Sequence, residues 1–116
     1  MGVELIEITL DRVVASMLVR PDLCTSGGIL HGGAIMAFAD TLGAVGTFVN
    51  LPEGGRTTTI ESKTNFLAAV PVSTQAFGES TPVHRGRTTM VWQTLIKSDS
   101  GKLCAMVIQT QIILPA

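Results

Sequence analysis

Residues 31–50 read HGGAIMAFADTLGAVGTFVN, the longest stretch of the chain whose apolar residues recur at helical spacing. Large apolar side chains stand three or four positions apart, as on one face of an α-helix: Ile35, Phe38, Leu42, Val45 and Val49. The other faces carry mostly glycine and alanine, so another backbone or a ligand could approach them closely. The pattern predicts a helix over 32–50.

The segments on either side of this helix have the spacing of short β-strands. Residues 3–8 and 12–20 precede it and are rich in Val, Ile and Leu. Later segments alternate with period two between Pro, Gly and Ser-rich turns. Four more strands are expected at 56–68, 72–81, 87–97 and 102–114. One helix and six strands joined mainly by tight turns predict a single α+β domain over 1–116, with an antiparallel sheet wrapped around the helix.

Composition excludes several classes of protein. The 116 residues are 46% hydrophobic and 15% charged with a net charge of -1, which suits a domain that hides apolar surface by forming oligomers. The eight Lys and Arg residues are scattered, so nucleic-acid binding is not expected. Two cysteines without CxxC spacing fit neither a disulfide framework nor a zinc site. No basic leader or run of about 18 apolar residues is present, which favours a cytoplasmic protein without a membrane span.

The start of the helix has the features of an anion or oxyanion site. His31, Gly32 and Gly33 stand where the loop becomes the helix, and the first N–H groups of a helix have no partner within it. Gly32 has no side chain to keep a carbonyl oxygen from its N–H, which favours a role in acyl transfer. Alternatively, the glycines only permit a tight turn from loop to helix.

Asp40 is the second candidate for chemistry, because it lies mid-helix among apolar neighbours, where aspartate has poor propensity. Only Thr41 and Thr47 accompany it as polar residues of the helix interior. Buried carboxylates usually have a partner or a function. Asp40 is therefore expected to act as a nucleophile or general base, although it could also be a solvated residue on a polar side of the helix.

The spacing of these candidates predicts a shared site. Asp40 lies nine positions after His31, which in a helix means opposite faces and roughly 13 Å along the axis. The helix start and the carboxylate can serve one reaction only if they come from two helices laid antiparallel across a two-fold axis. An active site at a dimer interface is expected.

Other catalytic motifs are missing from the chain. It has no HExxH or clustered Cys and His, no GxSxG elbow and no Walker loop, so neither a metal nor a serine nucleophile is expected. Cations near expected loops or strand ends could meet the phosphates of a small ligand, or could be ordinary surface charges. These are Arg56, Lys63, Arg85 and Arg87.

The segment HGGAIMAFADTLGAV resembles the hotdog-fold acyl-CoA thioesterases of the phenylacetate-degradation type, in the 4-hydroxybenzoyl-CoA thioesterase superfamily. Their helix has HGG, six residues and then Asp, as His31 to Asp40 do here. The resemblance continues through TTTIESKTNFLAAVP and HRGRTTMVWQTLIKSDSGKLCAMVIQTQI, nearly the whole chain. It implies the hotdog fold, a homodimer that could pair into a dimer of dimers, and hydrolysis of an acyl- or aryl-CoA. Coenzyme A would be part of the substrate, with no separate cofactor.

The resemblance also implies a role for individual residues. The Gly32 N–H would polarise the thioester carbonyl, and Asp40 of the neighbouring subunit would attack it or activate water, while His31 sets the loop. Thr59 resembles a family Ser or Thr that assists the water or the substrate. The turn that lies along the CoA arm in the family is matched by Gly86, Arg87 and Thr88.

The chain departs from the family pattern upstream of HGG. Members often have Asn or Gln there to hold the water, whereas this chain has Thr25 and Ser26, one of which must substitute unless the role is vacant.

Two other functions on the same fold compete with hydrolysis. A non-catalytic acyl-CoA sensor would lack a competent carboxylate, so Asp40 speaks against it. A dehydratase needs a catalytic His facing an acid, and neither His31 nor His84 lies in such a motif.

Overall fold

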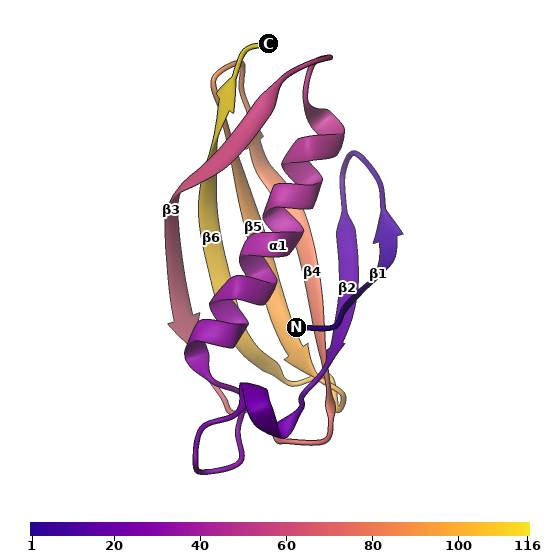
Figure 1. Ribbon diagram of the computed structural model, residues 1–116, viewed down its shortest axis with the longest axis vertical. Helices are drawn as coiled ribbons and strands as arrows, with labels where there is room; N and C mark the ends of the chain where they lie inside the picture. Colours follow the sequence, from indigo (N-terminus) through magenta and orange to yellow (C-terminus); the bar gives the residue numbers. More distant parts are fainter.

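A long helix crosses one face of a curved, six-stranded antiparallel sheet, as Figure 1 shows. This computed structural model describes residues 1–116. The helix α1 spans Gly32–Asn50 and follows a short 3-10 helix, η1, at Pro21–Leu23. The strands are β1 Val3–Ile8, β2 Val13–Leu18, β3 Arg56–Phe66, β4 Gln75–Arg85, β5 Thr89–Ser98 and β6 Leu103–Leu114. Their order is β1-β2-β4-β5-β6-β3, so β1 and β3 form the two edges.

The chain that leaves α1 goes to the far edge of the sheet. It turns at Gly54, whose φ of 76° is in the left-handed region that favours glycine. It then forms β3, which pairs only with β6. The 11 residues of β3 therefore run beside the helix with one edge unpaired. This connection brings a strand that follows the helix in sequence next to the middle of the helix.

The predicted helix is confirmed to the residue, but several strand boundaries differ from those expected, most of all the end of β4. The turn expected over 82–86 is still strand, because β4 continues to Arg85. β2 pairs with β4 only as far as Ser80, so the residues beyond have a neighbour on one side alone. Proline is tolerated in such an edge position, and the register shifts between Pro82 and His84. Pro82 therefore does not end the strand.

The buried face of α1 is broader than the predicted apolar stripe. It consists of Ile35, Phe38, Ala39, Leu42, Gly43, Gly46 and Thr47, whereas Val45 and Val49 are only partly buried. A Cβ atom at Gly46 would lie 2.7 Å from the ring of Trp92, which is fully buried. Glycine costs helix propensity, but here it lets the helix lie directly on the sheet.

The two faces of β6 differ from the usual arrangement of a sheet under a helix. The side chains turned toward α1 are Ala105, Val107, Gln109 and Gln111, all fully buried. On the other face of β6, Met106, Ile108 and Ile112 point away from the helix and are only partly buried. Two long amides, meanwhile, lie inside.

By length and a mean hydropathy of 1.4, α1 is apolar enough to cross a membrane. Its packing provides another reason for this composition. Seven of its residues are buried against the sheet, as expected for the core helix of an α+β domain.

Candidate active site

The start of α1 leaves two backbone donors, the N–H groups of Gly32 and Ala34, without an acceptor in the chain. His31 is the N-cap residue, and its Nδ1 accepts a hydrogen bond of 2.8 Å from the Gly33 N–H. The Gly32 N–H, one position before Gly33, is not reached by the His31 ring. His31 thus satisfies one donor at the positive end of the helix and leaves another available for a ligand. Its role of setting this loop for the reaction stays a prediction.

An apolar pocket of about 300 Å³ opens beside this donor. It is lined by Thr25, Ile29, Leu30, Gly32, Ile35, Phe66, Ala68 and Ala69. The ring of Phe66 comes so close that a Cβ atom at Gly32 would lie 3.1 Å from its Cζ atom. Of the two hydroxyl residues proposed to replace the missing amide, Thr25 lines this pocket and Ser26 does not.

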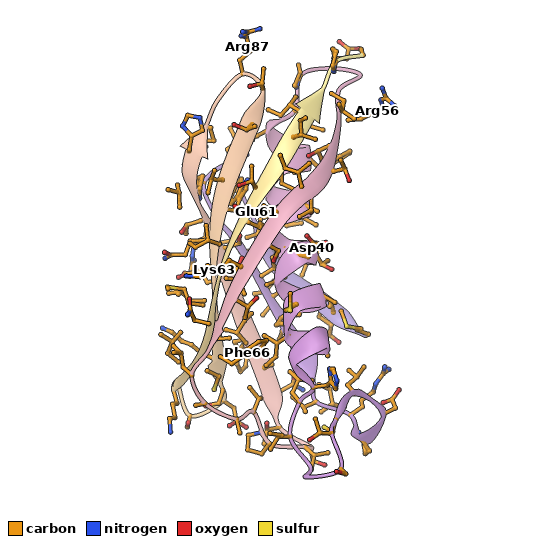
Figure 2. All side chains as sticks on the ribbon, turned by 90° about the vertical axis from the view of Figure 1, so that its left-hand side faces the viewer. Asp40, Arg56, Glu61, Lys63, Phe66 and Arg87 are labelled. Atoms are coloured by element: carbon orange, nitrogen blue, oxygen red, sulfur yellow. The ribbon has the colours of Figure 1, made fainter.

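Asp40 points toward β3 and β6, as Figure 2 shows. Its Oδ1 atom accepts a hydrogen bond of 2.6 Å from the Thr59 hydroxyl and one of 3.2 Å from Nε2 of Gln109. The Thr59 oxygen in turn accepts a hydrogen bond of 2.5 Å from Nε2 of Gln111. The side chain is partly buried rather than solvated on a polar helix face. The two residues selected from the sequence, Asp40 and Thr59, are therefore in direct contact.

The two glutamines are residues that sequence reasoning missed. A signal was present, because Gln109 and Gln111 stand two positions apart in an otherwise apolar strand and so share one face. The alternating apolar residues Met106, Ile108 and Ile112 suggest the opposite face of β6 as the core side, and so obscure this signal. A pair of long polar residues at alternate positions was the better indicator.

The two halves of the predicted site lie apart within one chain. The helix is continuous from Gly32 to Asp40, so these residues are separated by about 12 Å along its axis. Asp40 Oδ2 accepts no hydrogen bond from any donor of the chain. One protomer therefore offers a free donor at one place and a free carboxylate oxygen at another.

Two of the candidate phosphate-binding cations lie at the end of the molecule remote from the helix start. Figure 2 shows Arg56 and Arg87 at this end, with Phe66, which marks the helix start, toward the other. A second hollow of about 300 Å³ is lined there by Pro52, Arg87, Thr88, Ile113 and Pro115. Within one chain these cations are far from the Gly32 N–H, as the shared-site hypothesis requires.

The remaining candidates for CoA contacts have other surroundings. Arg85 forms an ion pair of 2.8 Å with Asp11 and donates to the Leu10 carbonyl, so it ties the β1–β2 turn to the end of β4. Lys63 lies opposite Ile108, on the face of the sheet turned away from α1. Gly86 forms the β4–β5 turn through its N–H bond to the Thr89 carbonyl. Their predicted contacts with CoA remain predictions.

Residues 27–105 match the family model described as the thioesterase superfamily. The chain belongs to the thioesterase superfamily. This member is an enzyme that hydrolyses a thioester, and its helix and six-stranded antiparallel sheet form the hotdog fold, as predicted.

Relatives of this thioesterase agree in fold and reaction class. The proofreading thioesterase EntH of Cronobacter turicensis is 30% identical over 104 residues, which are 90% of this chain and 75% of EntH. The structure of thioesterase HI1161 from Haemophilus influenzae has a TM-score of 0.91 at 29% identity, over 97% of this chain and 78% of that one. Smu.793 from Streptococcus mutans, solved bound to acetyl CoA, has a TM-score of 0.91 over 97% and 89% of the chains. At 19% identity, that likeness concerns the fold alone.

Proposed function

We propose that this thioesterase hydrolyses an acyl- or aryl-CoA to the free acid and CoA, at a site shared between two subunits. The observation that carries the proposal is the pair of unsatisfied groups: the Gly32 N–H beside an apolar pocket, and Oδ2 of a carboxylate otherwise held by the fold. The first group suits a thioester carbonyl oxygen beside an apolar acyl group. The second suits attack on that carbonyl or activation of water.

The reaction follows from these two groups. The Gly32 N–H donates to the carbonyl oxygen and stabilises the negative charge that develops there. The partner's Asp40 either attacks the carbonyl carbon or takes a proton from the water that attacks it. The tetrahedral intermediate then collapses, the carbon–sulfur bond breaks, and CoA leaves as the thiolate, which takes up a proton. If water attacked, the free acid is released in this step. If Asp40 attacked, the acyl group is left on it as an anhydride, which water cleaves to give the free acid and the original carboxylate. No metal is needed, because the helix start supplies the electrophilic assistance.

A second copy of the chain is the source of the missing half of the site. β3 has an unpaired edge next to the helix, and Ile60 and Phe66 on it are 56% and 54% exposed. A long edge strand with exposed apolar residues favours pairing with another strand. Pairing two copies about a two-fold axis would set the α1 helices antiparallel and bring the Asp40 of one toward the Gly32 of the other.

CoA recognition is assigned to the end that holds Arg87 and Thr88. In the paired arrangement, this end of one subunit lies toward the helix start of its partner. A guanidinium suits phosphate groups, because its planar donors can bind two oxygens. The same fold accommodates acetyl CoA in the Streptococcus mutans protein.

The activity test is hydrolysis of a panel of short, medium, long and aryl acyl-CoAs, with the released thiol measured optically. At least one member of the panel is expected to be turned over catalytically. Stoichiometric binding of an acyl-CoA without hydrolysis would instead identify a sensor. Hydrolysis of a thioester that lacks CoA, with no turnover of any CoA ester, would reject CoA as the carrier.

The first prediction concerns the oligomer. We expect a dimer to be the smallest folded unit, because a monomer leaves the β3 edge and its apolar side chains exposed. Sedimentation velocity at micromolar concentrations, with hydrolysis measured on the same samples, checks this. A folded monomer that retains full activity would contradict both the dimer and the shared site.

The second prediction concerns CoA affinity. Arg87→Ala is expected to raise KM about tenfold with kcat nearly unchanged, since a phosphate contact of this kind is worth about 1.4 kcal/mol and takes no part in the chemistry. Arg12→Ala is the matched control, because Arg12 forms ion pairs with Glu7 and Glu79 and is not a candidate for CoA contact. It should leave KM within about twofold of wild type. A loss of kcat alone in Arg87→Ala would assign Arg87 another role.

A further inference from the structure

Two glutamines lie where the sheet would ordinarily offer apolar side chains to its helix. Gln109 and Gln111 are both 0% exposed and project toward α1. Burying an amide costs stability unless its polar atoms find partners, and an unpaired one costs about 1–3 kcal/mol. Apolar side chains could be buried at these positions without that loss of stability. Both amides, however, donate a hydrogen bond to the group that surrounds Asp40.

Gln111 determines the direction of the proton on Thr59. Its Nε2 donates to the Thr59 oxygen at 2.5 Å, and the Thr59 oxygen lies 2.6 Å from Asp40 Oδ1. A threonine hydroxyl has one proton. Because the amide occupies an oxygen lone pair, that proton is free to point at the carboxylate, and each bond polarises the next. Thr59 therefore serves as a donor to Asp40.

Gln109, on β6, donates a second hydrogen bond to Oδ1 of Asp40. Its Nε2 lies 3.2 Å from Asp40 Oδ1 and 3.4 Å from the Asp40 carbonyl oxygen, so it grips both the side chain and the helix backbone. Its Oε1 is buried without any partner. An amide retained with one end unsatisfied is costly, which indicates that its donor end has a purpose.

The helix has a glycine at the place where this amide lies. A Cβ atom at Gly43 would stand 2.3 Å from Cδ of Gln109, which no real side chain tolerates. Glycine inside a helix costs about 1 kcal/mol relative to alanine. The glycine at position 43 therefore lowers helix propensity but leaves the space beside Asp40 that Gln109 occupies. The position of the Gln109 side chain thus depends on a glycine at position 43.

We propose that Gln109 and Gln111 are positioning residues for the reaction, an inference that rests on the proposed function of Asp40. Thr59 and Gln109 fix Oδ1 from two strands, and Gln111 fixes Thr59. The carboxylate is thereby held about its last torsion, with Oδ1 directed inward. Oδ2, which accepts no hydrogen bond from the chain, is the oxygen that attacks or takes the proton.

The principal test is Gln109→Met, which keeps an unbranched side chain of similar length and removes the donor. We expect kcat to fall about 10- to 100-fold with KM within about twofold, because a carboxylate that can rotate is misplaced for the reaction but leaves substrate binding intact. Added to Asp40→Asn, the same change should cause no further loss, since it acts only through that carboxylate. Gln111→Met, which acts through Thr59, should show a smaller loss of the same kind.

The variant Gln109→Glu supplies a readout that loss of packing alone would not give. At low pH the introduced carboxyl group is neutral and can donate to Asp40 Oδ1 as the amide does. At higher pH it ionises, and two carboxylates at this distance repel each other. Activity is therefore expected at low pH and should fall as the pH rises, in a limb that the wild-type profile lacks.

Thr94→Val is the matched control for a lost buried hydrogen bond. Thr94 is fully buried and donates to Ser80 at 3.0 Å, with no contact to Asp40. It should lower stability and leave kcat unchanged. A folded Gln109→Met enzyme with wild-type kcat would overturn the inference, as would an equal loss in Thr94→Val or an additive loss in the double variant. If Asp40→Asn itself keeps wild-type activity, the proposed function of Asp40 fails instead, whatever Gln109 does.

Discussion

Asp40→Asn is expected to lower kcat for acyl-CoA hydrolysis by about 10²- to 10⁴-fold, the usual effect of removing a positioned acid or base. The fold should survive, because the asparagine oxygen can still accept the hydrogen bonds that Thr59 and Gln109 donate to Oδ1. KM should change little, since the carboxylate acts on the thioester rather than on the CoA arm. Steady-state release of CoA thiol, with dimer formation checked by sedimentation, measures this.

The natural control is Thr41→Val, one position along the same helix. Its hydroxyl donates to the Ala37 carbonyl and touches nothing in the site. It should retain kcat within about twofold. A nearly wild-type Asp40→Asn enzyme would remove Asp40 from the mechanism and leave the helix start as the only supported element of the site.

Mixing Asp40→Asn with Gly32→Val is expected to restore activity that neither variant has alone. In a heterodimer, one site combines the intact Gly32 of one subunit with the intact Asp40 of the other, while the second site has both defects. Equal amounts and random exchange make half of the dimers mixed, each with one good site of two. The mixture should therefore reach about one quarter of wild-type activity.

Gly32→Val is suited to this experiment because it blocks the donor without an evident barrier to folding. Its new side chain would meet the ring of Phe66 at about 3.1 Å, a contact that a small shift of this terminal ring relieves, and sedimentation of the variant checks that it still forms a dimer. Subunit exchange is to be shown independently, by mass-tagging one variant. An inactive mixture in which exchange has occurred would reject the shared site and require a complete site within one chain.

The sequence was most informative where a single physical rule applied. Helical spacing located α1, and the conflict between helix propensity and an aspartate at position 40 singled out Asp40, which the fold places in contact with Thr59. It was misleading where a residue had two possible contexts. A proline such as Pro82 would end a strand that is paired on both sides, but an edge strand tolerates it. Only the sheet order reveals that the pairing of β4 with β2 ends at Ser80.

The glutamines show a different kind of limit. Binary patterning assigns polar residues outward, so by pattern alone Gln109 and Gln111 would lie away from the core. Their inward position depends on Asp40 and Thr59, which lie on elements far along the chain, and on the absence of a side chain at Gly43. Such a cluster is visible only once the chain has brought α1, β3 and β6 together.

The close seating of Gly46 on the ring of Trp92 gives the protein an internal optical probe. Trp92 is the only tryptophan and the chain has no tyrosine, so ultraviolet emission comes from a single indole. That indole is fully buried between sheet and helix, and its spectrum should shift to longer wavelength when water reaches it as α1 separates from the sheet. Fluorescence thus reports whether the helix that carries both Gly32 and Asp40 is still docked. A variant that loses turnover while its emission stays unchanged has lost chemistry and not structure.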